Sequence, residues 1–445
     1  MELQRVLKEG IGINDEFHFF NCIDTRAKAQ GKGRLSEVAI SVKDCICVKG
    51  LESTAGSAIL KGYKPVFDAT AVEKARDEGA LIIGKTSQDE FGFGSFNVNV
   101  GLGFDVPLNP HDKERTCGGS SGGAAGFTAK APFRHIALAE STGGSIVCPA
   151  SFCGVIGLCP TYGRVSRYGL MDYANSLDKI GVMARTMEDI ALAMEIISGY
   201  DPKDSTSLDV PVPDYAELLK KPITRMKLGI ISYGLGKGID KEVSNAVKNT
   251  MKKLEDKGCT LVDIELPLVE KYALPCYYIL AMAEASTNLA KYCGMRYGAQ
   301  ENLEGNFNEY FSKVRGKYFG EEAKRRIMLG TFARMAGFRD AYYLKAAKVR
   351  AKIIDEYKKA FERADVLISP TMPFVAPKFS EIKKLTPMQN YLADILTVGP
   401  NLAGLPHISV PIGKNKDGMP IGMMVIGDHL EEGLIMQLSG NVLLS

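Results

Sequence analysis

The chain has 445 residues, of which 45% are hydrophobic and 24% are charged, and its formal net charge at pH 7 is only +3. This composition is typical of a globular protein with a large core, and the small net charge argues against a chain that grips a nucleic acid backbone by itself. No apolar run approaches the roughly 20 residues that a membrane-spanning helix needs, and the first residues do not resemble a secretory signal. We therefore expect a cytoplasmic protein without a membrane segment.

The ten cysteines are scattered rather than arranged in a paired framework. Cys45 and Cys47 have the wrong spacing for a zinc knuckle, and Cys148, Cys153 and Cys159 have no histidine nearby. We therefore expect reduced, buried thiols and no metal site.

The N-terminal part of the chain predicts a helical lead-in followed by a β-α-β unit. The lead-in is expected over residues 1–30. Residues 38–43 are apolar on both faces, which is typical of a buried central strand, and helical spacing over 68–80 is followed by a second apolar strand at 81–84. This order indicates parallel strands. Lys43 ends the first strand, where a lysine is unusual, so it either extends to the surface or has a function.

The C-terminal half continues the alternation of strands and helices, which predicts an α/β fold. Residues 200–225 carry Asp, Pro, Ser and Lys and are the best candidate for an exposed connection. The expected elements are a helix at 187–197, a strand at 227–232, a helix at 240–257, a strand at 259–266, mostly helix over 275–364, a strand at 366–370, a helix at 387–403, and paired strands at 408–411 and 421–426.

Two glycine-rich turns, each containing serine, lie close together between Cys117 and Pro149. The first is Gly118–Gly123, with the sequence GGSSGG, and the second is Thr142–Ser145, with the sequence TGGS. Glycine lets backbone N–H groups approach a ligand atom closely. A serine in such a turn can act as a nucleophile beside N–H donors that stabilise a developing oxyanion. The two turns therefore predict one site built from both.

The base that would activate such a serine is not an obvious histidine. The segment Gly118–Gly122 fits the G-x-S-x-G pattern of serine hydrolases, but polar residues and a proline precede it where that pattern needs a strand. Only three histidines follow it, and no phosphate-loop lysine follows the glycines. Lys43 is the candidate base, because burial favours a neutral lysine.

Lys43, the GGSSGG turn, the STGGSI turn and the following segment at 148–154 resemble the amidase signature family. Further matches resemble the glutamine-hydrolysing branch of tRNA-dependent amidotransferases, and they lie at 160–169, 324–330, 340–343 and 401–406. The resemblance covers roughly residues 36–430. It implies a single domain over 1–445 with one large mixed β-sheet flanked by helices on both faces. Its parts would be a core at 36–200 that carries the site, and the remaining sheet with a helical substrate-binding part at 226–430.

The resemblance also implies a Ser–cis-Ser–Lys triad. Ser145 would be the nucleophile, Ser120, preceded by a cis peptide bond, would relay the proton, and Lys43 would be the base. The oxyanion hole would be formed by the backbone N–H groups of Thr142, Gly143 and Gly144. Ser121 would be a hydrogen-bonding neighbour.

Substrate contacts follow from the same resemblance. Arg326 would bind the α-carboxylate of glutamine, Asp394 would bind its α-ammonium group, and Tyr277 would lie nearby. The alternatives are a surface arginine and a solvated aspartate on their helices, and the adjacent Arg325 is a second candidate for the carboxylate.

The function that the resemblance implies is that of a glutaminase subunit. It would release ammonia from glutamine through a seryl ester and pass it to a partner in a heterotrimer with B and C subunits. The complex would use ATP and Mg²⁺ to amidate Glu-tRNA(Gln), with Asp-tRNA(Asn) as an open further substrate, while this chain would bind no cofactor.

Two other functions remain as alternatives. A free-standing amidase for small amides would not need an amino-acid clamp of Arg326 and Asp394. A scaffold subunit with an inactive site would not need Lys43, Ser120 and Ser145.

The chain departs from the family pattern at three places. The segment between the two turns is one residue longer, which leaves Ser121 as an alternative bridging serine. Glu140-Ser141 stands where we expect Gly or Ser followed by Asp, and residues 104–106 replace an expected Gly-Pro-Thr. None of these departures removes Lys43, Ser120 or Ser145.

Overall fold

The computed structural model describes residues 3–28 and 32–444, and within them eleven strands form one sheet. The strands are β1 Phe20–Ile23, β2 Ala39–Lys43, β3 Leu81–Thr86, β4 His135–Ser141, β5 Ile156–Cys159, β6 Lys179–Ala184, β7 Lys227–Ile231, β8 Thr260–Ile264, β9 Val366–Pro370, β10 His407–Lys414 and β11 Pro420–Ile426. Their order across the sheet is β1-β3-β2-β4-β6-β5-β10-β11-β9-β7-β8.

The sheet has a parallel group of strands in each half of the chain. Strand β2 is parallel to β3 and to β4, and β7 is parallel to β8 and to β9. The other neighbours are antiparallel, including the β10–β11 hairpin that joins the two halves. The expected α/β fold with one large mixed sheet is therefore confirmed.

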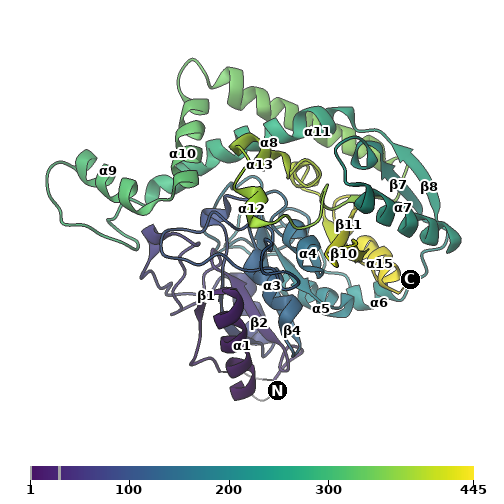
Figure 1. Ribbon diagram of the computed structural model, residues 1–445, viewed down its shortest axis with the longest axis horizontal. Coiled ribbons are helices and arrows are strands. Elements are labelled where there is room, and N and C mark those ends of the chain that lie inside the picture. Colours follow the sequence, from purple (N-terminus) through teal and green to yellow (C-terminus); the bar gives the residue numbers. More distant parts are fainter. Residues whose placement is uncertain (1–2, 29–31, 445) are drawn as a thin grey trace.

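Most α-helices of the described residues lie around this sheet, whereas those labelled α9 and α10 extend away from it (Figure 1). The helices are α1 Leu3–Phe17, α2 Thr70–Asp77, α3 Gly122–Lys130, α4 Val147–Cys153, α5 Met187–Ile197, α6 Tyr215–Leu219, α7 Lys241–Asp256, α8 Pro267–Asn288, α9 Phe307–Tyr318, α10 Glu321–Arg334, α11 Lys345–Phe361, α12 Phe379–Ile382, α13 Pro387–Leu392, α14 Val398–Leu402 and α15 Glu432–Leu443. Helices α8, α10 and α11 pack together and appear in green above the N-terminal half in Figure 1.

Both faces of the parallel group β3-β2-β4 are covered. Side chains alternate between the two faces of a strand, and on β4 Ile136 and Leu138 join one hydrophobic cluster whereas Ala137 and Ala139 join another. The first cluster contains apolar residues of α2 and α5, and the second contains residues of α1 and α3. The helices on both faces that we expected are therefore present around this part of the sheet.

Several elements lie where the sequence predicts them. Helix α5 and strand β9 have the predicted bounds, and the hairpin of β10 and β11 was expected from its two apolar strands. Helix α5 begins after Thr186, whose side chain accepts a hydrogen bond from the backbone N–H of Asp189. Such an N-cap satisfies a backbone donor that the first turn leaves unpaired. The 200–225 segment contains the short helix α6, and the division of the chain into parts stays a prediction.

The lead-in contains more than helix. Helix α1 ends at Phe17, and residues 20–23 form strand β1, which pairs antiparallel with β3 at the edge of the sheet. Residues 1–2 and 29–30 of the predicted lead-in lie outside the described residues. A short edge strand of four residues gives too little periodicity to be recognised beside a helix.

The single helix expected over 387–403 is wrong. The structure has two short helices there, α13 and α14, separated by residues 393–397. Pro400 explains part of the break, because a proline has no N–H to bond to residue 396 and fits only within the first turn of a helix. The break places Asp394 between the two helices.

Candidate active site

Two neighbouring parallel strands bring the first functional side chains together. Lys43 is the last residue of β2, and Glu140 lies near the end of β4, which is aligned with β2 so that Val42 is beside Leu138. Ser120 lies just before α3, and its peptide bond with Gly119 is cis, as the resemblance implied. The carboxyl ends of parallel strands are a common place for sites in α/β proteins.

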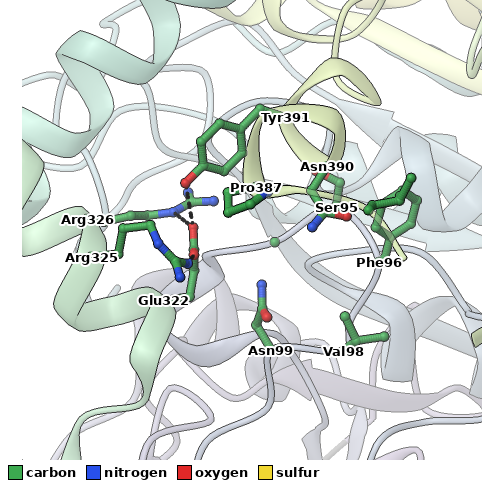
Figure 2. A pocket seen from close by; sticks show the side chains of 12 residues that line it. Ser95, Phe96, Val98, Asn99, Glu322, Arg325, Arg326, Pro387, Asn390 and Tyr391 are labelled. Carbon is green, nitrogen blue, oxygen red and sulfur yellow. Dashed lines mark hydrogen bonds and ion pairs between the residues drawn. The ribbon is translucent and has the colours of Figure 1, made fainter. Parts of the chain in front are cut away.

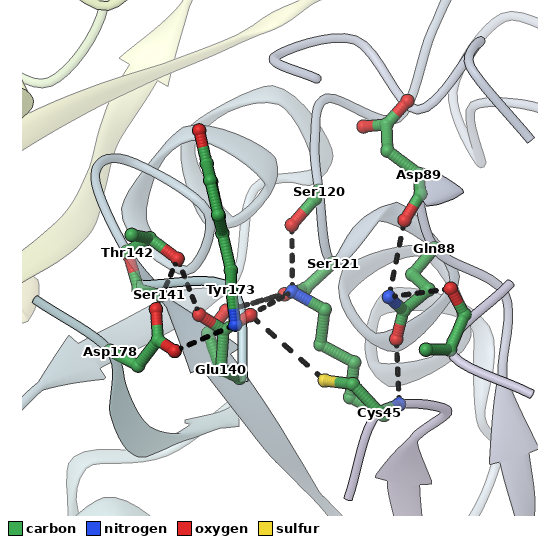
Figure 3. Close-up of polar contacts among 12 residues, drawn as sticks. Cys45, Gln88, Asp89, Ser120, Ser121, Glu140, Ser141, Thr142, Tyr173 and Asp178 are labelled. Carbon is green, nitrogen blue, oxygen red and sulfur yellow. Dashed lines mark hydrogen bonds and ion pairs between the residues drawn. The ribbon is translucent and has the colours of Figure 1, made fainter. Parts of the chain in front are cut away.

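Lys43 is held by three oxygen atoms, one from Ser120 and two from Glu140, and both of these residues are labelled in Figure 3. Its Nζ donates to Ser120 Oγ at 2.7 Å, to Glu140 Oε2 at 2.8 Å and to the Glu140 carbonyl at 2.9 Å. An ammonium group has three N–H donors, so these three acceptors fit the protonated form. The side chain of Lys43 is fully buried, so the alternative of a lysine that extends to the surface is wrong.

Ser121 lies beside Ser120 but makes a different contact. Its hydroxyl donates to the Glu140 carbonyl at 3.1 Å, whereas Lys43 Nζ contacts the Ser120 hydroxyl. This arrangement favours Ser120 over Ser121 as the bridging serine. It also agrees with the expected role of Ser121 as a hydrogen-bonding neighbour.

The second glycine turn follows directly after β4 and carries Ser145. Ser145 is buried except for 7% of its surface, and in the described part of the chain its hydroxyl forms no hydrogen bond. The backbone N–H groups of Gly143 and Gly144 likewise donate to no described acceptor. A hydroxyl and two N–H groups therefore remain available to a substrate on this turn.

Gly143 and Gly144 are required by close packing. A Cβ atom added to Gly143 would lie 2.9 Å from the Tyr277 hydroxyl, and one added to Gly144 would lie 2.5 Å from Thr397 Oγ1. Real Cβ contacts are not this short, so a side chain at either position would displace its neighbour. Tyr277 is thus placed against the turn that we expect to form the oxyanion hole.

Arg326 lies on α10 in an aromatic cage. Its guanidinium lies 5.1–5.8 Å from the ring centres of Phe93, Tyr173, Tyr278 and Tyr391. It also donates to the Tyr173 hydroxyl at 2.7 Å and to Glu322 Oε1 at 2.8 Å. Burial works against this charge, but the surrounding tyrosines and Glu322 together hold the pKa of Arg326 well above its usual range.

Asp394 faces this cage from the break between α13 and α14. Its Oδ2 accepts hydrogen bonds from Tyr278 Oη at 2.6 Å and from Ser95 Oγ at 2.8 Å. Burial raises the pKa of the Asp394 carboxyl above its ordinary value, and these two hydrogen bonds only partly offset that effect. The tyrosine that donates to Asp394 is Tyr278, whereas the Tyr277 hydroxyl lies against Gly143.

A cavity of about 190 Å³ opens beside these charges (Figure 2). Glu322, Arg325 and Arg326 line it from α10, and Pro387, Asn390 and Tyr391 line it from α13. The loop before the first glycine turn adds Gly94, Ser95, Phe96, Val98 and Asn99. Arg326 is almost fully buried, whereas the Arg325 side chain is 41% exposed and forms an ion pair with Glu322. The surface alternatives for Arg326 and Asp394 are therefore wrong, and Arg326 is the better-placed cation.

Several residues of the site were not predicted from the sequence. They are Glu140, Tyr173, Asp178, Tyr278 and Glu322. Glu322 could have been found, because it lies four residues before Arg326 on one helix face. Glu140 was noticed only as a departure from a pattern. Tyr173 and Asp178 lie in a loop segment without periodicity, so no sequence signal connects them to the two turns.

The described residues contain no group of three or more His, Cys, Asp or Glu side chains that could hold a metal ion. Among the same residues, no helix has the length and apolar character to cross a membrane.

Comparison with known proteins shows the class to which this fold and site belong. The profile of the Amidase family matches residues 21–436. The chain belongs to the Amidase family.

Two relatives and one solved structure that are similar to this chain carry the same name. The A subunit of glutamyl-tRNA(Gln) amidotransferase from Microcystis aeruginosa is 46% identical over 413 residues, which cover 93% of this chain and 84% of the relative. The protein of the same name from Persephonella marina is 48% identical over 402 residues, covering 90% of this chain and 82% of that one. The crystal structure of the protein of this name from Thermotoga maritima superposes with a TM-score of 0.84 at 37% identity, covering 98% of this chain and 89% of the other.

Proposed function

We propose that this chain is the glutamine-hydrolysing A subunit of a tRNA-dependent amidotransferase and that it supplies ammonia to a partner protein in the complex. The observation that carries this proposal is the pair of buried opposite charges, Arg326 and Asp394, close to the serine–lysine centre. Ser95, which donates to Asp394, accepts from the N–H of Gly119, the residue before Ser120. Free glutamine carries an α-carboxylate and an α-ammonium group, which such a pair recognises. The amidotransferase relatives from Microcystis and Persephonella share 46% and 48% of the aligned residues with this chain.

The proposed reaction begins at Ser145. Its hydroxyl attacks the side-chain carbonyl of glutamine while its proton passes to Ser120, and Ser120 passes its own proton to neutral Lys43. The 2.7 Å contact between Lys43 Nζ and Ser120 Oγ supports the last transfer. The oxyanion that forms would accept hydrogen bonds from the N–H groups of Thr142, Gly143 and Gly144.

Breakdown of this intermediate releases ammonia. The carbon–nitrogen bond breaks as the proton returns from Lys43 through Ser120 to the leaving nitrogen, which leaves a glutamyl ester on Ser145. Water then hydrolyses the ester with the same groups acting in reverse. Tyr277, which packs against Gly143, would keep the turn in place during both steps.

The remaining chemistry belongs to partners in this proposal. B and C subunits would complete a heterotrimer, and the partner that binds the misacylated tRNA would use ATP and Mg²⁺ to install the ammonia. This chain would bind no cofactor, and we assign the reaction to the cytoplasm as part of the same proposal. The small net charge of the chain supports a division of labour in which a partner binds most of the tRNA.

A free-standing amidase is the second candidate, because the serine–lysine centre alone would serve any small amide. The two candidates separate in one assay of ammonia release from glutamine, asparagine and simple aliphatic amides, with and without candidate partner subunits. We expect glutamine-selective release that the partners increase. Broad amide hydrolysis that is indifferent to partners would replace this proposal with the free-standing amidase.

The same assay tests the nucleophile. Ser145→Ala is expected to lower kcat by at least about 10³-fold, the scale seen when a serine nucleophile is removed. Ser121→Ala is the matched control, because Ser121 only donates to the Glu140 carbonyl. Activity that survives in Ser145→Ala would show that another residue attacks the amide.

A further inference from the structure

Glu140 brings a negative charge to the candidate base. One carboxylate oxygen, Oε2, accepts from Lys43 Nζ at 2.8 Å, and both side chains are almost completely buried. The other oxygen, Oε1, accepts from the Thr142 hydroxyl at 2.8 Å, and Thr142 is the first residue of the turn that carries Ser145. A single carboxylate therefore connects the lysine to the turn (Figure 3).

The contact between Lys43 and Glu140 requires Lys43 to lose a proton before it can act as the base. An ammonium group has no lone pair, so Lys43 in the form that fits its three oxygen partners cannot accept a proton from Ser120. Lys43 must first lose a proton inside a site that solvent does not reach. Of its three oxygen partners, only the Glu140 carboxylate is a group that readily accepts one.

A second carboxyl completes the cluster. Asp178 Oδ1 lies 2.8 Å from the Thr142 hydroxyl oxygen, the same distance as Glu140 Oε1. A hydroxyl carries one hydrogen and can donate it to only one of these two carboxyl groups. The second short contact therefore needs a proton on a carboxyl, so that one of Glu140 and Asp178 is neutral.

Of the two carboxyl groups, that of Asp178 is the one that carries the proton more readily. The described ion pairs give Glu140 a cation, Lys43, but give none to Asp178. Burial, followed by the charge of Glu140, raises the pKa of the Asp178 carboxyl well above its ordinary value, although the N–H of Ala174 acts in the opposite direction. A neutral Asp178 leaves Glu140 as the ionised partner of Lys43.

We propose that Glu140 is a positioning residue that acts through Lys43, holding it against Ser120 and taking up the proton that Lys43 must release before it can serve as the base. This inference rests on the proposed function, because it concerns the same amide hydrolysis. It also gives a role to a residue that stands where the family pattern has Gly or Ser.

The proton transfer is balanced within the cluster. One N–H bond of the Lys43 ammonium breaks and one O–H bond forms at Glu140 Oε2, so an ion pair becomes a neutral amine and a neutral carboxylic acid. The freed lone pair on Nζ then accepts the proton of Ser120 as Ser120 accepts that of Ser145. When ammonia leaves, Lys43 passes this proton through Ser120 to the leaving nitrogen. The proton on Glu140 Oε2 then returns to Nζ, which restores the ion pair.

The other groups that face this cluster come from several elements. Near Glu140 these are Cys45, which follows β2 and lies 4.0 Å from Oε2, and Cys159 of β5. Asp172 faces Asp178, and Asp89 in the loop after β3 faces Lys43. Burial raises the pKa of both Cys45 and Cys159, so these thiols stay neutral near pH 7.

Two nearly isosteric variants test the proposal by comparison, both in the complete chain assembled with its partners. In Glu140→Gln the proton acceptor is lost although the amide oxygen can still accept from Lys43. In Asp178→Asn the amide imitates a protonated carboxyl, since it can donate to Thr142. We expect kcat for glutamine to fall about 10²-fold in Glu140→Gln, as for loss of a proton-transfer group. In Asp178→Asn the factor by which kcat falls should be smaller by at least about tenfold.

Further measurements separate this role from a purely structural one. KM for glutamine should change by less than about threefold in Glu140→Gln, because the residue does not line the cavity. Without an internal acceptor the Lys43 proton must leave to solvent, so kcat of Glu140→Gln should rise steeply with pH where that of wild type is nearly flat. Glu140→Asp should recover part of the loss, and thermal melting of each variant checks that it is folded.

The outcomes distinguish the two proposals. If Ser145→Ala is inactive while Glu140→Gln matches wild type in kcat and in pH profile, the function stands and the role of Glu140 is overturned. A larger loss of kcat in Asp178→Asn than in Glu140→Gln would show that Asp178 is the ionised carboxyl. This result would also overturn the role proposed for Glu140. If wild type hydrolyses other amides but not glutamine, the same comparison is made on those amides, because it depends on Lys43 and not on the amino-acid clamp.

Discussion

Two buried cations, Lys43 and Arg326, belong to the candidate site, and their surroundings differ in kind. Three oxygen atoms contact Lys43, one of them from a carboxylate. Four aromatic rings surround Arg326, and it donates hydrogen bonds to the hydroxyl of one of them, Tyr173, and to the Glu322 carboxylate. The first environment can exchange protons with its cation, whereas the second stabilises a fixed charge.

This difference corresponds to two requirements of amide hydrolysis. A base must gain and lose a proton in every cycle, so it needs a neighbour that can hold one. A group that binds a substrate carboxylate must stay charged, and arginine does so in proteins. Burial raises the pKa of both Tyr173 and Tyr278, so the phenols around Arg326 keep their protons as well.

The largest effect that this comparison predicts comes from Lys43→Met. Loss of the base should lower kcat by about 10²- to 10⁴-fold, and the unpaired Glu140 carboxylate should destabilise the fold by about 3 kcal/mol. Denaturant unfolding and ammonia release measure the two effects. Glu140→Gln added to this variant should restore most of the stability but none of the activity. A double variant that is no more stable would mean that the buried pair contributes little.

Arg326→Met is expected to act on binding. Loss of the charged hydrogen-bond donors should raise KM for glutamine about 10- to 100-fold, since such bonds contribute roughly 1.5–3 kcal/mol. Hydrolysis of a simple aliphatic amide should change much less, because that substrate has no carboxylate. Arg325→Met serves as the comparison, since the Arg325 side chain is 41% exposed whereas Arg326 is almost fully buried. A larger effect in Arg325→Met would reassign the carboxylate site.

The pH dependence of binding should report on Asp394. Its pKa lies above the ordinary aspartate value because of burial, so the carboxyl becomes neutral at less acidic pH than a free aspartate. Only the ionised form attracts the α-ammonium group, and kcat/KM for glutamine should therefore fall as the pH drops through this raised pKa. Asp394→Asn should lower kcat/KM about tenfold and remove this acid decline. An acid decline that persists in the variant would have to come from another group.

Thr186→Ala should give the smallest effect and calibrates the others. Loss of the N-cap of α5 should lower the free energy of unfolding by about 1 kcal/mol. The cap lies outside both cation environments, so kcat and KM should match wild type. If this variant also lost activity, a fall in stability alone could explain the effects at Lys43 and Arg326.

The site was predictable from sequence wherever local sequence carries its chemistry. The two glycine–serine turns lie within one short segment, and Lys43 ends a strand that is apolar on both faces. The resemblance connected them, and the structure brings Lys43 and Ser120 into contact. The contact of Tyr278 with Asp394 could not be predicted, because adjacent helix residues point in different directions and only packing decides which one faces Asp394.

The sequence by itself determined the α/β class, most of the long elements and the local chemistry of the two turns, because periodicity and turn composition are local properties. The tertiary structure alone decided which charges meet. Glu140 and Asp178 are separated in sequence from Lys43, and they reach it through the pairing of β2 with β4 and through the Thr142 hydroxyl. Burial then decides their protonation, because the free energy of a charge depends on every group around it and not on its neighbours in the chain.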